Sequence, residues 1–318
     1  MELPTIKNKG TVIFPGARLS NGSQVLRETL DTNLMEGTLG VHSVREFDNN
    51  VYVYIDNEIK DIQTKEQMDE IGSSYTFYLL REVQAFINRL WEVKDNNIYV
   101  RDGFLLSYDK NFEDGYTYKA SVSAINSFSD CRKVNSIFSD KEIEKAIEGF
   151  EPSSFEDYDE KLGGGKYVTS DHFYIKKGSN RMLRARYFTL AARDSAIAPM
   201  KILHYCNALE CLFTVGTAEI SHKIAERVAV MLATTAEDKK LIFELVKSAY
   251  KYRSKLVHGQ HLTKTEEALA LTDISRELDS ILRQLIVTNH EIFDEDDTRI
   301  ESFFTDLVFN TSTVGSQT

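Results

Sequence analysis

The stretch TAEDKKLIFELVKSAYKYRSKLVHG, residues 235–259, decides the fold of the second half of this chain. Apolar residues recur in it at spacings of three and four, which is the period of a helix with one buried side. Thr235 is suited to cap the first turn, where acidic residues oppose the helix dipole favourably, and Gly259 is placed to end the helix. The stretch therefore predicts a helix that runs to about Val257.

The residues around this helix keep the helical period from about Ser179 to Val308, with breaks that polar caps, Pro and Gly make readable. Pro199 suits the first turn of one of these helices, and Ser221 is expected to cap another. We therefore predict an all-α domain with further helices over Arg181–Arg193, Pro199–Phe213, Ser221–Leu232, Glu266–Phe293 and Thr298–Val308.

The first half of the chain instead contains short segments rich in Val, Ile, Tyr and Phe, bounded by turn residues such as Asp102-Gly103. One long helical pattern, residues 64–93, interrupts them. The strands are expected at residues 11–14, 51–55, 97–108, 116–128 and 167–176.

The predicted fold class is therefore α+β, with a β-rich N-terminal domain that contains one long helix, followed by an all-α helical bundle. The expected domains are residues 1–176 and 177–309, and the small polar residues 310–318 are expected to form a disordered tail. Residues 151–166 form an acidic segment that ends in Gly163-Gly164-Gly165-Lys166. This ending lacks the spacing of a phosphate-binding loop and predicts a surface loop near the domain boundary.

Composition narrows the possible partners and cofactors. The net charge is -11, so any contact with nucleic acid must be local rather than spread over a broad basic surface. Neither a membrane-spanning segment nor a signal peptide is expected, which favours the cytoplasm. The three cysteines lack metal-site spacing, and His258 with His261 has no cluster of further ligands nearby, so no metal or other cofactor is expected.

Arg253 lies near the middle of the apolar stripe of the 235–257 helix. A guanidinium cannot lose its charge, so this position calls for a paired carboxylate, a bound anion or a groove between subunits. A structural ion pair, for instance with Glu210, satisfies this need without any catalytic role.

His258 follows Arg253 by five residues, which is about 140° around an ideal helix. The two side chains can therefore converge only if the helix ends between them or if two chains contribute. A structural alternative exists here as well, because an imidazole at a helix C-terminus is favoured by the helix dipole.

Together, Arg253, the four residues after it and His258, at the end of a helix, resemble the active-site motif of the HEPN superfamily. The surroundings are similar to its Apea-like branch. Residues 208–213, ALECLF, resemble the Ala-Leu-Glu-x-Leu-Phe segment of that branch, and residues 225–232, AERVAVML, resemble its Arg-x-Ala-x-x-Leu helix. The resemblance covers roughly residues 180–300.

The resemblance implies a metal-independent endoribonuclease that cleaves single-stranded RNA or tRNA to 2′,3′-cyclic phosphate ends. It also implies a homodimer through the helical domain, and a role in antiviral or abortive-infection defence in which a phage component or ligand acts on the N-terminal domain. Arg253 and His258 would be catalytic, with Ser254 and Glu210 in support. The residues expected to contact RNA are Lys247, Lys251, Tyr252 and Lys255.

Ser254 departs from the family pattern, in which many active members have Asn, Asp or His directly after the Arg. A hydroxyl can still hydrogen-bond a phosphate. The alternative is therefore a catalytically weak or inactive module that dimerises or binds RNA. A nucleotidyltransferase partner or a metal-dependent hydrolase is a third interpretation, but its carboxylate or ligand motif is missing from the sequence.

Overall fold

A computed structural model describes residues 10–21, 37, 39–40, 47, 50–55, 64–108, 115–155, 181–216, 218–260 and 265–310 of the chain. Helices and antiparallel strands are both present, so the fold is mixed α+β. The chain divides into two compact units. Unit 1 comprises residues 1–125 and 134–160, and unit 2 comprises residues 126–133 and 161–318. The predicted boundary at residues 176–177 lies outside the described residues.

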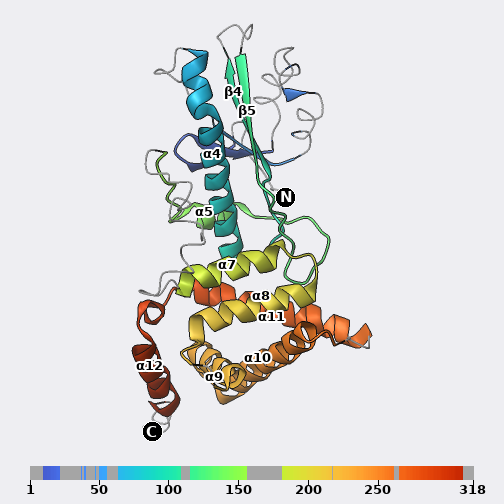
Figure 1. Ribbon diagram of the computed structural model, residues 1–318, viewed down its shortest axis with the longest axis vertical. Helices are drawn as coiled ribbons and strands as arrows, with labels where there is room; N and C mark the ends of the chain where they lie inside the picture. The colour runs from blue at the N-terminus through green and yellow to red at the C-terminus, as the bar shows by residue number, and fades with distance from the viewer. Residues whose placement is uncertain are drawn as a thin grey trace. The chain divides into compact units, whose positions relative to one another are not determined.

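Two small antiparallel sheets form the β-part of unit 1 (Figure 1). In the first, β1 (Thr11–Phe14) and β3 (Tyr52–Ile55) flank β2 (Ala17–Ser20), a strand that the sequence pattern did not predict. In the second, β4 (Asp102–Tyr108) pairs with β5 (Gly115–Ser121). The strands expected over residues 97–108 and 116–128 are thus shorter than predicted, and the strand at 167–176 lies outside the described residues.

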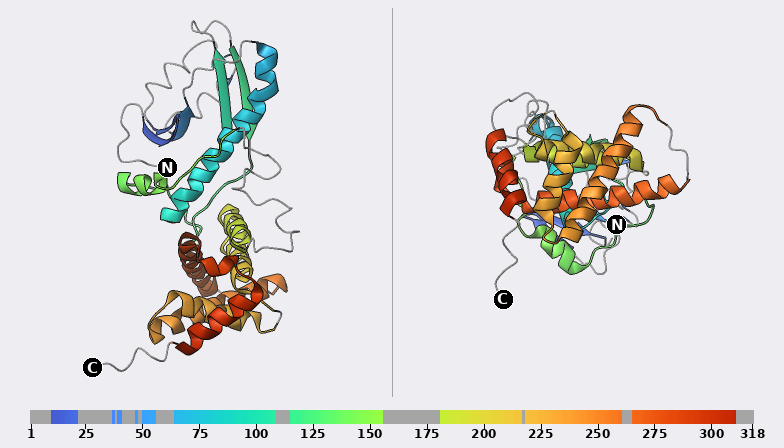
Figure 2. Two further views of the ribbon diagram at one scale, coloured as in Figure 1. Left: turned by 90° about the vertical axis from the view of Figure 1, so that its left-hand side faces the viewer. Right: turned by 90° about the horizontal axis from the view of Figure 1, so that it is seen from below.

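The Asp102-Gly103 pair does not form the predicted turn, because both residues pair with β5 inside β4. The two views place the long helix α4 (Lys65–Val93) along these strands (Figures 1 and 2). A Cβ atom on Gly103 would lie 3.4 Å from the Cβ of Leu80 on α4. This is an ordinary van der Waals distance, so Gly103 is a residue of the strand that packs beside α4 and not part of a turn.

The helix predicted over residues 64–93 is confirmed as α4, which Thr64 caps by accepting the backbone N–H of Gln67 at 3.3 Å. A second helix, α5 (Asp140–Ile147), was not predicted, although Ser139 and Glu142 form a capping box at its start. The core of unit 1 lies between the first sheet and these two helices. Its buried side chains are Ile13, Phe14, Ala17, Leu19, Phe86, Leu90, Phe138, Ile143 and Ala146.

Unit 2 is mainly helical in its described part. Its elements are α7 (Arg181–Asp194), α8 (Ala198–Phe213), α9 (Ile220–Leu232), α10 (Ala236–Val257), α11 (Thr265–Thr288), the 3₁₀ turn η2 (Glu291–Asp294) and α12 (Asp297–Asn310). α8 packs against α7, α10 and α11, and α9 packs against α10 (Figures 1 and 2). The boundaries of α7, α8, α10 and α12 agree with the predictions to within a few residues.

Two predictions in unit 2 are wrong. Ser221 does not cap α9, because the helix begins one residue earlier and the Ser221 hydroxyl lies 3.4 Å from the ammonium of Lys247. The single helix expected over residues 266–293 is broken at Asn289, which adopts a φ of 43°. Asn tolerates this left-handed conformation, and the His290 ring then accepts the N–H of Ile292 to start η2. The helix therefore ends at this point, although the apolar residues continue at helical spacing.

Residues 126–133 belong with the helices of unit 2 because buried polar groups hold them there. The buried Lys201 ammonium donates to the carbonyls of Ala192 at 2.8 Å and Ser127 at 3.3 Å. Ser275 donates to the carbonyl of Ser129 at 2.5 Å. A lysine at the C-terminus of α7 also opposes the negative end of the helix dipole.

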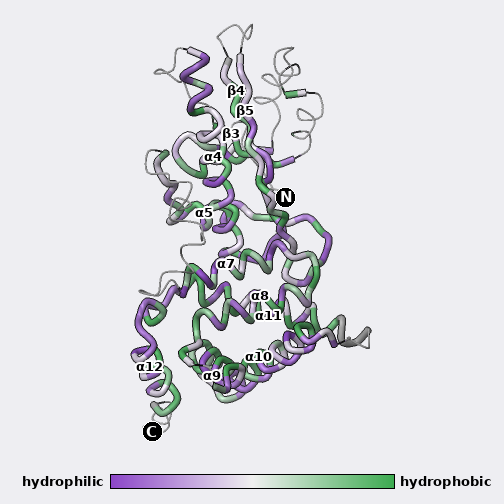
Figure 3. The backbone as a smooth tube through the Cα atoms, viewed as in Figure 1, coloured by the Kyte–Doolittle hydropathy of each residue, from purple (hydrophilic) through white to green (hydrophobic). Residues whose placement is uncertain are grey.

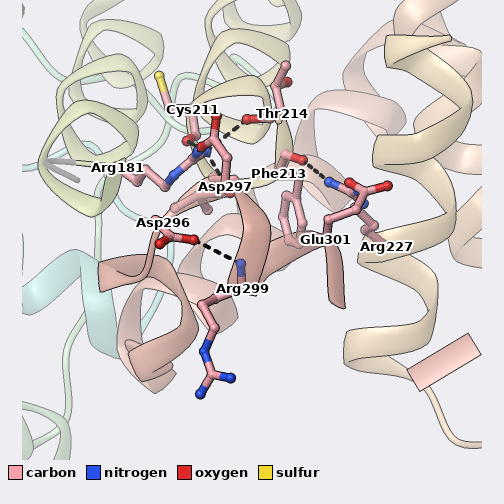
Figure 4. Close-up of polar contacts among 10 residues, drawn as sticks. Arg181, Cys211, Phe213, Thr214, Arg227, Asp296, Asp297, Arg299 and Glu301 are labelled. Carbon is pink, nitrogen blue, oxygen red and sulfur yellow. Dashed lines mark hydrogen bonds and ion pairs between the residues drawn. The ribbon is translucent and has the colours of Figure 1, made fainter. Parts of the chain in front are cut away.

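Two arginines connect the end of α8 to α12 (Figure 4). Buried Arg181 donates to the carbonyls of Cys211 and Thr214, at 3.2 and 2.9 Å, and pairs with Asp297. Buried Arg227 donates to the carbonyl of Phe213 at 2.6 Å and pairs with Glu301. Both guanidiniums thus satisfy carbonyls that the last turn of α8 leaves without helical partners. The end of α8 is fixed by its contacts with three other helices.

The core of unit 2 lies where α8 meets its neighbours and includes Tyr205, Leu209, Leu212, Val228, Val246, Leu278 and Leu282. Figure 3 shows the backbone of α10 changing repeatedly between hydrophilic and hydrophobic colours, as an amphipathic helix does. No helix in the described parts of the chain has the length and apolar character needed to cross a membrane.

Candidate functional site

The C-terminus of α10 is fixed by backbone geometry that its sequence predicts. Gly259 adopts a φ of 66°, and its N–H donates to the carbonyl of Leu256 at 3.1 Å. The N–H of Gln260 donates to the carbonyl of Lys255 at 2.9 Å, which completes a Schellman motif. His258 is therefore the last residue before the chain turns away, and its side chain is exposed.

Arg253 lies one turn earlier and meets α8. Its Nη2 atom is 3.6 Å from Oε1 of Glu210, and the two side chains are 33% and 29% exposed. The Nε atom of Arg253 is buried without a hydrogen-bond partner in the described structure. The carboxylate partner anticipated from the sequence is thus present. Its distance is longer than a well-formed hydrogen bond, so most of the guanidinium donors are left for another acceptor.

Tyr250 holds this part of α10 against α8. Its ring is buried, and its hydroxyl donates to the carbonyl of Cys206 at 3.3 Å. Burial raises the pKa of the Tyr250 phenol well above its ordinary value, and the nearby Glu210 carboxylate adds to this shift. Tyr250 is therefore a neutral packing residue that positions the helix turn carrying Arg253.

The residues predicted to contact RNA lie on the rest of the same helix. Lys251 is exposed, while Lys247, Tyr252 and Lys255 are half-buried. Ser254, which was predicted to support the catalytic residues, is exposed as well. The Lys255 ammonium lies 5.7 Å from the centre of the Tyr252 ring, within the range of a cation–π contact. The Lys247 ammonium is directed to Ser221 on α9. These side chains give the C-terminal half of α10 a local positive charge on an acidic protein.

Of the predicted site residues, the structure brings together Arg253 with Glu210 and Lys255 with Tyr252. Within the described ranges, no hydrogen bond or ion pair joins Arg253 to His258. In the same ranges, no group of three or more His, Cys, Asp or Glu side chains is arranged to hold a metal ion.

A cavity of about 490 Å³ that is broadly open to solvent lies between α7 and α8 and was not predicted. Glu210, whose carboxylate pairs with Arg253, is one of the residues that line it. Its walls are Arg181, Arg184, Phe188, Asn207, Glu210, Cys211 and Thr214. The sequence does contain a signal for it. Residues 181, 184 and 188 share one face of α7, and residues 207, 210 and 211 share one face of α8, with Thr214 directly after its end. Most of these residues are polar, at helical spacings where an apolar stripe is expected.

Charged groups gather around the cavity wall. Burial raises the pKa of the Cys211 thiol to about 11, while Arg184 lowers it and Glu210 raises it further. Nε of Arg184 and Oγ1 of Thr214 are buried and have no hydrogen-bond partner among the described residues. The cavity thus combines one aromatic ring, positive and negative groups, and polar atoms with unused hydrogen-bonding capacity.

Comparison of the chain with protein-family models, with curated proteins and with solved structures finds no match.

Proposed function

We propose that unit 2 is a metal-independent endoribonuclease of the HEPN type, which cleaves single-stranded RNA or tRNA and acts as a homodimer. The observation that carries the proposal is the end of α10. There Arg253 is held beside Glu210 with its Nε unsatisfied, and the exposed His258 follows one turn later. The resemblance of this segment and of residues 208–213 and 225–232 to the HEPN family supports the same function.

RNA supplies its own nucleophile, so two side chains suffice for the reaction. The 2′-hydroxyl gives its proton to a base, and its oxygen attacks the adjacent phosphorus. The bond from phosphorus to the 5′-oxygen then breaks, and that oxygen takes up a proton. The products are a 2′,3′-cyclic phosphate and a 5′-hydroxyl. His258 moves a proton to or from the reacting oxygens, because an imidazole exchanges protons near neutral pH.

Arg253 stabilises the negative charge that grows on the phosphorane oxygens. A guanidinium carries five N–H donors in a planar fork, and Glu210 engages only one of its nitrogens, at 3.6 Å. The ion pair therefore orients the guanidinium while leaving donors for the phosphate. Lys247, Lys251 and Lys255 attract the RNA backbone to the same helix, and Tyr252 offers a ring to an unpaired base.

Two HEPN-like units together would form the cleft, with one α10 helix from each subunit. We further propose that unit 1 senses a phage component or ligand and controls the ribonuclease, as the defence role of the family implies. In this proposal the reaction takes place in the cytoplasm.

A module that binds RNA or dimerises without cleaving is the second candidate. Two observations favour it: Ser254 occupies the position after Arg253, and Glu210 already pairs with Arg253. In that case the ion pair has only a structural role, and His258 is an exposed helix-terminal residue.

The test is cleavage of end-labelled single-stranded RNA and tRNA in the presence of EDTA by the full chain and by His258→Ala. The matched control is His222→Ala, which removes another exposed histidine from the same unit. We expect cyclic phosphate ends from the parent and from the control, and no cleavage by His258→Ala. Binding of RNA without cleavage by any of the three would favour the second candidate. Cleavage that EDTA abolishes would show a metal-dependent reaction and overturn the proposal.

A further inference from the structure

We propose that the α7–α8 cavity binds one unpaired RNA base, with a preference for guanine, next to the phosphate that Arg253 contacts. The inference rests on the proposed function, because it takes RNA to be the ligand. The cavity volume of about 490 Å³ falls within the range of small-ligand sites. A cavity this size admits a base only when the base is not paired, so the substrate is single-stranded or a loop.

Phe188 supplies the aromatic surface that unpaired bases stack on. Its ring is already oriented by its neighbours. The ring of His204 is stacked with it at 6.4 Å between centroids, and the ring of Tyr187 meets it edge-on at 5.4 Å. A ring that is held before the ligand arrives loses little conformational freedom on binding.

Glu210 and Asn207 decide which base binds best, because both can hydrogen-bond the polar edge of a base. A carboxylate only accepts hydrogen bonds, so it selects bases that present N–H donors. Guanine presents two adjacent donors, the ring N–H and the exocyclic amine, with a carbonyl oxygen beside them. The amide of Asn207 can donate to that oxygen while Glu210 accepts from the two donors. Uracil, adenine and cytosine lack this donor pair.

Arg184 adds an anion contact at the same wall. Its Nε is buried and has no hydrogen-bond partner in the described structure, and its positive charge lies close enough to act on the Cys211 thiol. The positive charge of this guanidinium attracts a phosphate attached to the bound nucleotide. Arg181, by contrast, is already engaged by the carbonyls of α8 and by Asp297.

Glu210 links the cavity to the proposed reaction, because the same side chain pairs with Arg253. A base held against Glu210 therefore places its own backbone next to the guanidinium. The cavity thus becomes the specificity site of the ribonuclease, and cleavage should occur beside guanosine.

The test measures binding of fluorescein-labelled RNA hexamers to the full chain carrying His258→Ala, which prevents cleavage. One hexamer is all uridine, and the other has a single guanosine within the same run. We expect the guanosine hexamer to bind about tenfold more tightly, because a stacked and hydrogen-bonded base adds affinity of this order. Phe188→Ala and Asn207→Ala should each remove most of the difference. Phe188→Tyr, which keeps an aromatic ring, should retain it.

The matched control is Phe309→Ala, which removes a phenylalanine side chain of α12 that is 74% exposed and outside the cavity wall. It should keep the guanosine preference, and circular dichroism should show that every variant is folded. Equal binding of the two hexamers by the parent, or an unchanged preference in folded Phe188→Ala, would overturn the inference. A different result would overturn the proposed ribonuclease alone: the wild-type chain would not cleave RNA, although the guanosine preference that depends on the cavity would persist.

Discussion

Glu210 pairs with Arg253 on α10, with 3.6 Å between Oε1 and Nη2, and the same residue lines the cavity between α7 and α8. The last turn of α8, which carries Glu210, is in turn held by Arg181 and Arg227 through its terminal carbonyls (Figure 4). One carboxylate therefore connects the proposed catalytic arginine with the proposed base site, and its backbone has little freedom to move.

Replacing Arg253 separates a catalytic role from a structural one. The ion pair with Glu210 is long and about one-third exposed, so its contribution to stability is about 0–1 kcal/mol. For Arg253→Ala we expect RNA cleavage to be lost while the melting temperature falls by at most about 4 °C. Arg276→Ala, which breaks an exposed pair with Asp273, should retain cleavage. A large fall in melting temperature with cleavage intact would show that the pair is structural.

Gly259 makes the turn that places His258, because its φ of 66° belongs to the left-handed region. A Cβ atom there would have no steric neighbour within 4 Å, so the cost of Gly259→Ala comes from the backbone and is about 1 kcal/mol. Chemical denaturation should show this loss, and Gly259→Asn should lose less. The control is Gly216→Ala, at an equally open position without a positive φ. Its stability should stay within about 0.5 kcal/mol of the parent.

The sequence predicted α10 well because three independent signals agree there: the Thr235 cap, the apolar period and Gly259. It also identified Glu210 as a partner for Arg253 by a charge argument. The predictions from the sequence were wrong where the conformation of one or two residues departs from the surrounding pattern. Asn289 breaks a continuous apolar period, and Asp102-Gly103 pairs inside a strand instead of forming a turn.

The cavity escaped prediction for a different reason. Its walls come from two helices, and the polar face of one helix, read alone, does not show that the polar face of the other lies opposite it. Only the packing of α7 on α8 brings Phe188 and Arg184 to the same space as Asn207 and Glu210. The spacing of residues in one sequence shows which side chains share a face of a helix. It does not show which faces of two helices pack against each other.

Arg227 should be among the most sensitive residues of unit 2. It is buried, donates to the carbonyl of Phe213 at 2.6 Å, pairs with Glu301 and lies 5.3 Å from the centre of the Phe304 ring. Arg227→Ala leaves the carbonyl unsatisfied and the carboxylate unpaired, so we expect a loss of about 2–3 kcal/mol in urea unfolding. Arg299 is the control because its exposed side chain points away from these groups (Figure 4). Equal losses for the two alanine variants would contradict the assigned role.

His204 should make the stability of unit 2 depend on pH. Burial lowers the pKa of its imidazole below the usual 6.5, so the folded protein resists protonation at a pH where the unfolded chain accepts a proton. Acid therefore favours unfolding. The stability contributed by neutral His204 is present above pH 6.5, declines as the pH falls below this value, and reaches its minimum once the pH lies below the folded pKa.

The measurement is urea unfolding at pH 7.5 and 5.5 for the parent, His204→Gln and His204→Leu. Other groups also titrate in this range, so the quantity that matters is the difference in stability between the two pH values, compared across the three proteins. We expect this difference to be smaller in both variants than in the parent.

The same protonation should affect the α7–α8 cavity, because the His204 ring is stacked with Phe188. It should loosen the cavity wall, and the guanosine preference should weaken at pH 5.5. An identical loss of stability in all three proteins would remove His204 as the cause.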